Sequence, residues 1–123
     1  MTPQDLIAEF RDAVYDNGDQ RNILKLIQDT LLDGLKDFPA SDDLLLEAAI
    51  AYDTLVDEAE TALSYYAKVK NVSRTDYLVN YARCLARTGD SDQALVLLDS
   101  AAVPPPAEVA EMRKDILEGL WDE

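Results

Sequence analysis

The stretch YLVNYARCLARTGDSDQALVLLDSA, from Tyr77 to Ala101, decides the fold of this 123-residue chain. Apolar residues recur in it at helical spacing on both sides of a break at Thr88-Gly89-Asp90. They are Leu78, Tyr81, Ala82 and Leu85 before the break, and Ala94, Leu98 and Ala101 after it. Gly89 predicts a left-handed helix stop, and the small Ala82 and Ala94 allow two helices to approach closely. The stretch therefore predicts two helices packed as a hairpin.

These residues resemble the tetratricopeptide repeat (TPR), a helix-turn-helix unit of about 34 residues. The positions of the repeat pattern are occupied by Leu78 in the tryptophan position, then Tyr81, Ala82, Leu85, Ala94, Leu98 and Pro106. As sequence, the resemblance covers Thr75 to Pro106. It implies a helical repeat scaffold, a class that mostly binds other proteins.

Two further parts of the chain repeat the arrangement more loosely. Asn17-Gly18-Asp19 mirrors the turn at Gly89, although Arg11 falls where a small residue belongs. In the middle of the chain, Ala48 with Tyr52 and Ala62 with Tyr66 resemble the two helices of one repeat. A generic all-helical bundle is the alternative interpretation.

Capping and breaking residues predict where the helices lie. The expected helices cover about 2–16, 20–36, 41–54, 57–69, 73–88 and 91–102, with a seventh at about 107–121 after Pro104-Pro105-Pro106. We therefore expect an all-α, single TPR-like domain over 1–123. Antiparallel helix pairs at about 2–38, 41–69 and 73–102 would stack as a short right-handed superhelix. The C-terminal helix, with Val109, Met112, Ile116 and Leu120 on one stripe, would be its capping helix.

Acidic residues dominate the charge of the chain. It has 25 acids, 11 bases and no histidine, for a net charge of −14. Residues 1–60 hold 15 acids and 4 bases, a net −11, whereas residues 61–123 hold 10 and 7, a net −3. This disfavours direct binding to nucleic acid or to anionic membranes, because both need a basic surface. A partner protein with a basic patch is the simplest complement, and solubility alone is the other explanation of the charge.

One polar stripe lies on the helix expected at 73–88. Asp76, Asn80, Arg83 and Arg87 are spaced four, three and four residues apart, so they share a face. The resemblance implies that this face lines the concave partner-binding groove, with Asn80 where such repeats hold a ligand's backbone. Lys68, Lys70 and Arg74 extend the positive area, and the alternative is that Asp76 and nearby acids neutralise the arginines.

Three further residues are secondary partner-binding candidates. Glu47 is the acid expected to face the groove from the middle helix pair, and it argues against recognition of a chaperone's terminal carboxylate. Tyr65 and Trp121 are the other two, and an exposed Tyr65, Tyr66 or Trp121 could instead hold together a homodimer. Because Tyr65 and Tyr66 are adjacent, at most one of them is expected in the core.

Catalysis has little support in the sequence. The absence of histidine excludes triads built on it, and no phosphate-binding loop or metal-ligand spacing is present, so we expect no catalytic residues, no metal and no cofactor. The single cysteine, Cys84, is expected to be a small buried hydrophobe. With no apolar run long enough to cross a membrane and no signal-peptide pattern, we expect a cytoplasmic protein.

Two function classes are consistent with these features. The first is a non-enzymatic interaction module, an adaptor, assembly factor or small acidic chaperone that binds a partner peptide or helix in its groove. The second is an acidic decoy that mimics nucleic acid and occupies a basic DNA- or RNA-binding protein.

Overall fold

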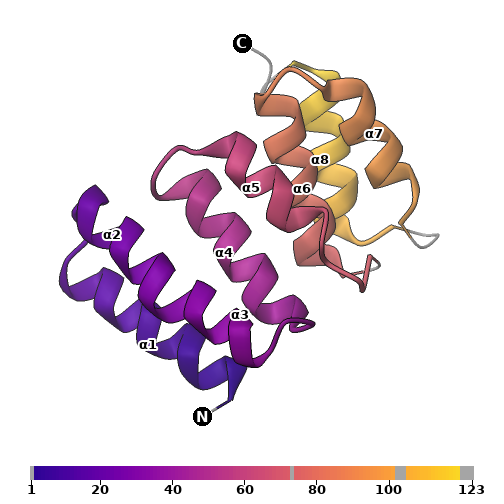
Figure 1. Cartoon of the computed structure of the whole chain (residues 1–123). Coiled ribbons are helices and arrows are strands. Elements are labelled where there is room, and N and C mark those ends of the chain that lie inside the picture. The colour runs from indigo at the N-terminus through magenta and orange to yellow at the C-terminus, as the bar shows by residue number, and fades with distance from the viewer. Residues whose placement is uncertain (1, 73, 102–104, 120–123) are drawn as a thin grey trace. The chain divides into compact units, whose positions relative to one another are not determined.

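The computed structural model describes residues 2–72, 74–101 and 105–119, and these form seven helices and no strand (Figure 1). The chain divides into two compact units, 1–70 and 71–123. The all-α prediction is confirmed, and so are two of the packed helix pairs, α4 with α5 and α6 with α7. The repeat superhelix and the single TPR-like domain remain predictions.

The first unit contains four helices. They are α1 (Pro3–Asp16), a long helix made of α2 (Gln20–Leu26), η1 (Ile27–Leu32) and α3 (Asp33–Asp37), then α4 (Asp42–Thr54) and α5 (Ala59–Tyr66). In Figure 1, α1 and the long helix lie side by side, and α4 packs on both of them as well as on α5. Phe10, Ile27, Leu31 and Leu44 are fully buried where these helices meet.

Local signals explain where these helices begin. Thr2 caps α1 through a reciprocal box, in which its hydroxyl accepts from Asp5 N at 3.2 Å and Thr2 N donates to Asp5 Oδ2 at 2.8 Å. Ser41 caps α4 by accepting from Leu44 N at 3.3 Å. In each cap the polar side chain satisfies a backbone amide that has no partner within its helix.

The long helix differs from the expected α-helix in its middle. Residues Ile27–Leu32 form a π-helical segment, with hydrogen bonds five residues apart. The apolar residues Ile23, Ile27 and Leu31 repeat every four residues, which is more than the roughly 3.6 residues of one α-helical turn. In a regular α-helix their side chains would therefore drift around the helix axis. The wider π turn offsets this drift, so all three side chains stay buried on one face.

Helix α5 is shorter than the expected 57–69. Asp57 has a φ of 54°, a left-handed conformation that a helix does not accommodate, and α5 starts only at Ala59. At the other end, Lys68 N and Val69 N bond to carbonyls three residues back, at Tyr65 and Tyr66. This tightened last turn ends the α-helix at Tyr66.

The second unit packs three helices, α6 (Thr75–Arg87), α7 (Ser91–Asp99) and α8 (Ala107–Leu117). Gly89 has a φ of 92°, so the predicted left-handed stop is confirmed, and Asp90 caps α7 by accepting from Gln93 N at 3.2 Å. Ala82 and Ala94 are 0% exposed, as expected of small residues between close helices. On α8, Val109, Met112 and Ile116 are buried, while Leu120 lies outside the described residues.

Candidate functional site

The predicted polar stripe lies on α6, which the sequence expected to begin at Ser73 and which begins at Thr75. Ser73 itself lies outside the described residues. Of the four stripe residues, Asp76 and Asn80 line one pocket, Arg83 is bonded to Asn80, and Arg87 is half-buried near the far end of the helix. The pocket is therefore centred on the first two turns of α6.

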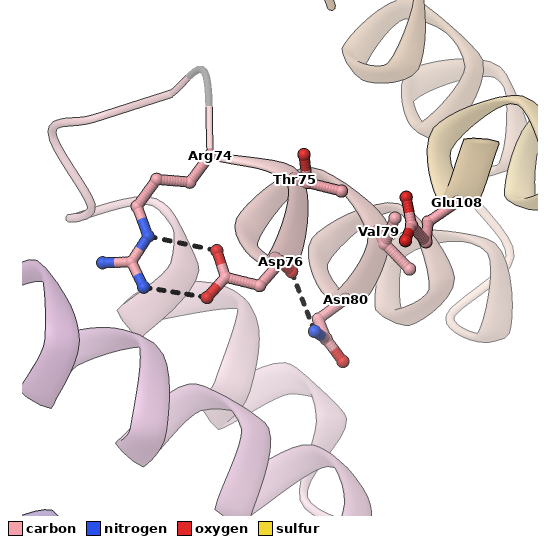
Figure 2. A pocket seen from close by; sticks show the side chains of 6 residues that line it. All are labelled: Arg74, Thr75, Asp76, Val79, Asn80 and Glu108. Carbon is pink, nitrogen blue, oxygen red and sulfur yellow. Dashed lines mark hydrogen bonds and ion pairs between the residues drawn. The ribbon is translucent and has the colours of Figure 1, made fainter. Parts of the chain in front are cut away.

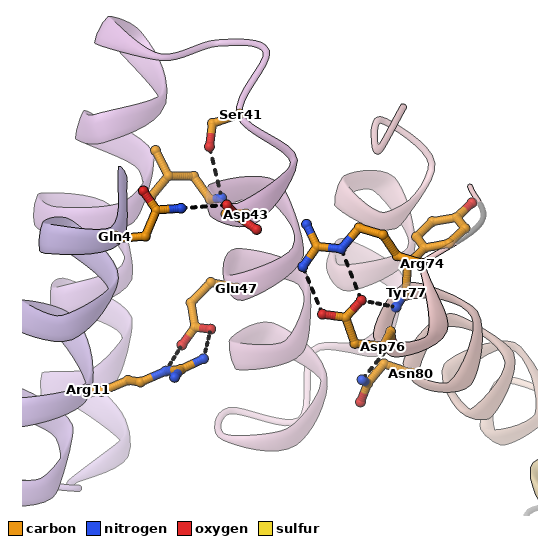
Figure 3. A network of polar contacts seen from close by, with 10 residues as sticks. Gln4, Arg11, Ser41, Asp43, Glu47, Arg74, Asp76, Tyr77 and Asn80 are labelled. Carbon is orange, nitrogen blue, oxygen red and sulfur yellow. Dashed lines mark hydrogen bonds and ion pairs between the residues drawn. The ribbon is translucent and has the colours of Figure 1, made fainter. Parts of the chain in front are cut away.

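Asp76 is held by Arg74, which immediately precedes the helix. Arg74 Nε donates to Asp76 Oδ1 at 3.1 Å and Nη2 donates to Oδ2 at 2.8 Å, a bidentate pair, and Tyr77 N donates to the same Oδ1 at 2.8 Å (Figure 3). The hydrogen bonds from Arg74 hold the pKa of the Asp76 carboxyl below its usual range. The negative charge of Asp76 is thus compensated from outside the predicted stripe.

Asn80 connects the pocket to the arginines. Its Nδ2 donates to the Asp76 carbonyl at 2.8 Å, and its Oδ1 accepts from Arg83 Nη2 at 2.8 Å. These two bonds fix the orientation of the amide, so its second N–H and second lone pair point in set directions. A primary amide held in this way is suited to pairing with the N–H and C=O of a peptide backbone.

The pocket has a volume of 510 Å³ and lies between the start of α6 and α8. It is lined by Arg74, Thr75, Asp76, Val79, Asn80 and Glu108. Figure 2 shows the Arg74–Asp76 pair at one end of this set and Glu108, from α8, at the other. Val79 is the apolar element, so the pocket combines an apolar contact with charges of both signs and one oriented amide.

Glu47 lies in the first unit and is engaged within the fold. Arg11 Nε donates to Glu47 Oε2 at 3.0 Å and Nη2 donates to Oε1 at 2.7 Å, which joins α1 to α4 (Figure 3). The Glu47 side chain is 12% exposed and the Arg11 side chain 68%. The hydrogen bond and the charge of Glu47 raise the pKa of Arg11 above its usual value. The structure therefore gives Glu47 a structural role as the ion-pair partner of Arg11, and its predicted contact with a partner protein stays a prediction.

The aromatic candidates are placed as follows. The Tyr65 ring stacks on Tyr52 with centroids 5.5 Å apart, and Lys68 Nζ lies 4.9 Å from the Tyr65 centroid. Tyr65 remains half-exposed, whereas Tyr66 is 0% exposed. The prediction that at most one of the pair is core is confirmed, and Tyr66 is excluded as a surface contact. Trp121 lies outside the described residues.

Other predicted features concern chemistry and membranes. Cys84 is fully buried in α6, which agrees with its interpretation as a small hydrophobe. Within the described residues, no group of cysteine, aspartate and glutamate side chains is arranged to hold a metal ion. No described helix is long and apolar enough to cross a membrane.

Comparisons of the chain with protein-family models, curated proteins and solved structures found no match. The resemblance to the tetratricopeptide repeat therefore rests on the residues quoted for it.

Sequence reasoning missed several residues of the pocket. Val79 lies three residues after Asp76, so helical spacing from Asp76 predicts it on the same face, but a search confined to polar residues omits it. Arg74 was expected to extend the positive area, and the structure instead pairs it with Asp76, which agrees with the alternative that this acid neutralises an arginine within the fold. Glu108 comes from a helix 28 residues after Asn80, and no local pattern links the two.

Proposed function

We propose that this chain is a non-enzymatic protein-interaction module that binds a peptide segment of a partner protein at the start of α6. The observation that carries the proposal is the pocket formed by Val79, the oriented Asn80 amide and the compensated Asp76. Apolar contact gives affinity, and a few fixed polar groups set orientation, which is how such sites commonly work.

The charges indicate which segments fit. Because Arg74 compensates Asp76, the pocket is not dominated by one sign of charge, and Glu108 stands opposite that pair. A segment of mixed charge with one apolar side chain over Val79 and a backbone amide at Asn80 suits this arrangement. TPR-like binding in a concave groove is the form of this function that the sequence resemblance favours.

A selection with random peptides tests the proposal. Peptides displayed on phage are enriched on the immobilised wild-type chain and then measured by calorimetry against Val79→Ser and Asn80→Ala. We expect Val79→Ser to weaken binding about fivefold, since it removes two methyl groups from an apolar contact. Val96→Ser is the matched control, because Val96 is 62% exposed on α7 and does not line the pocket. Enriched peptides that bind all three variants as tightly as wild type contradict the proposal.

A further inference from the structure

The first unit contains a hollow surface where α1 faces the long helix. This groove has a volume of 470 Å³ and is lined by Leu6, Glu9, Asp29, Thr30, Asp33, Gly34, Asp37 and Phe38. Leu6 and Glu9 belong to α1, and the other residues lie between η1 and the end of α3. The two helices that form it run side by side in Figure 1.

The groove has acidic walls. Asp29, Asp33 and Asp37 follow one another every four residues, so they form a row with a spacing of about 6 Å along the helix. Glu9 stands on the α1 side, and all four carboxylates are exposed. The cation paired with this row is Lys36, 3.5 Å from Asp33, and both of these side chains are largely in solvent, where such a pair contributes little.

Thr30 supplies an observation that is independent of the acids. Its side chain lines the groove and is only 9% exposed, yet it makes no hydrogen bond within the described residues. Helical threonines commonly donate to a carbonyl of the preceding turn, as Thr54 does to the Ile50 carbonyl at 2.8 Å. The hydroxyl reaches the surface of the groove and is not sealed in the protein interior. Thr30 therefore offers one donor and one acceptor to a polar group bound in the groove.

The spacing of the carboxylates indicates how the positive charges of a ligand would be distributed. No group of acids in the described residues is close enough to hold one metal ion, so the groove favours several positive charges along a chain over a single multivalent cation. Leu6 and Phe38 add apolar surface between the charges. We propose that this groove binds a basic, amphipathic peptide segment of a partner protein, with Lys or Arg side chains along the Asp29–Asp33–Asp37 row and a polar group at Thr30. This proposal is independent of the α6 pocket.

A labelled peptide tests it directly. The probe is a peptide of about four helical turns with lysine at every fourth position and leucines beside them, and its affinity is measured by fluorescence anisotropy. The triple variant Asp29→Asn, Asp33→Asn, Asp37→Asn is expected to bind it about tenfold more weakly than wild type. Thr30→Val keeps the shape, removes the hydroxyl, and is expected to weaken binding about threefold.

A charge-matched control separates a site from bulk charge. The control variant Asp12→Asn, Asp16→Asn, Glu60→Gln removes an equal number of negative charges, three, from exposed positions outside the groove. We expect it to change the affinity for the peptide less than about twofold. Circular dichroism verifies that each variant is folded. The proposal is overturned if both triple variants weaken binding equally, if Thr30→Val binds as wild type does, or if a peptide with the same lysines placed consecutively binds as tightly. Val79→Ser must leave this affinity unchanged, which separates the outcome from that of the α6 pocket.

Discussion

Removing Arg11 should destabilise the chain more than removing the charge of its partner Glu47. The pair is asymmetric, because Glu47 is 12% exposed while Arg11 is 68% exposed. In Arg11→Met, a nearly buried carboxylate loses both of its hydrogen bonds from the guanidinium. In Glu47→Gln, the guanidinium that loses its counter-charge is already largely in water, and the new amide can still accept a hydrogen bond.

The magnitude lies between two known limits. Breaking a fully buried pair costs about 3–5 kcal/mol, and an exposed pair is worth roughly 0.2–1 kcal/mol. With one partner buried, we expect Arg11→Met to lower the free energy of unfolding by about 1–2 kcal/mol, and Glu47→Gln by less than about 1 kcal/mol. The double variant should cost less than the sum, because the interaction is lost only once.

Urea unfolding followed by circular dichroism measures these energies, and hydrogen exchange in α1 and α4 locates the effect. Arg21→Met is the matched control, since Arg21 is exposed and its guanidinium makes no hydrogen bond within the described residues. We expect this control to fall within about 0.5 kcal/mol of wild type. Equal and additive costs for Arg11→Met and Glu47→Gln would refute the reasoning, because they would mean that the pair acts as an ordinary surface ion pair.

Three further predictions concern other parts of the fold. The Arg74 hydrogen bonds depress the pKa of Asp76 below its ordinary value of 3.8, so the stability they provide is present above that pH and lost as the pH falls. Arg74→Met should flatten this acid dependence in unfolding curves between pH 2 and 5, and an unchanged slope would contradict it. A Cβ at Gly34 would lie 2.5 Å from Leu6 Cδ1, which must turn aside, and 3.5 Å from Cδ1 of the fully buried Leu44, so the branched side chain of Gly34→Val should lower the unfolding free energy by about 1–3 kcal/mol, and a second change, Leu6→Ala, should recover part of that loss. The Cys84 thiol is buried, so it should react with a disulfide reagent only as fast as the unit opens, and reaction at the rate of free cysteine would show that the α6 interior is accessible.

The α6–α7 hairpin was predictable because its signals are local. Helical spacing, the small Ala82 and Ala94, and the stop at Gly89 each constrain neighbouring residues, and the structure has all of them as expected. The π segment was not predictable in this way. It arises because the buried four-residue repeat through Ile27 must match two other helices at once, which is a tertiary demand.

The candidate site was predictable only in part, for the same physical reason. Asp76 and Asn80 share a face by helical spacing alone, so the sequence places them together. Glu108 reaches the same pocket from α8, and Arg11 reaches Glu47 across 36 positions in the sequence. Side chains that meet across different helices are brought together by packing, which no spacing within one helix encodes.

Two arginine pairs each compensate one acid of the fold. In the first unit, Arg11 stands where the repeat pattern expects a small residue, and it compensates the nearly buried Glu47. In the second, Arg74 compensates Asp76 beside the α6 pocket. By contrast, the row of Asp29, Asp33 and Asp37 faces solvent, where a carboxylate costs little to keep charged. Arg11 thus compensates an acid whose burial would otherwise cost stability, whereas the aspartate row lies at the surface, where the proposed basic segment would meet it.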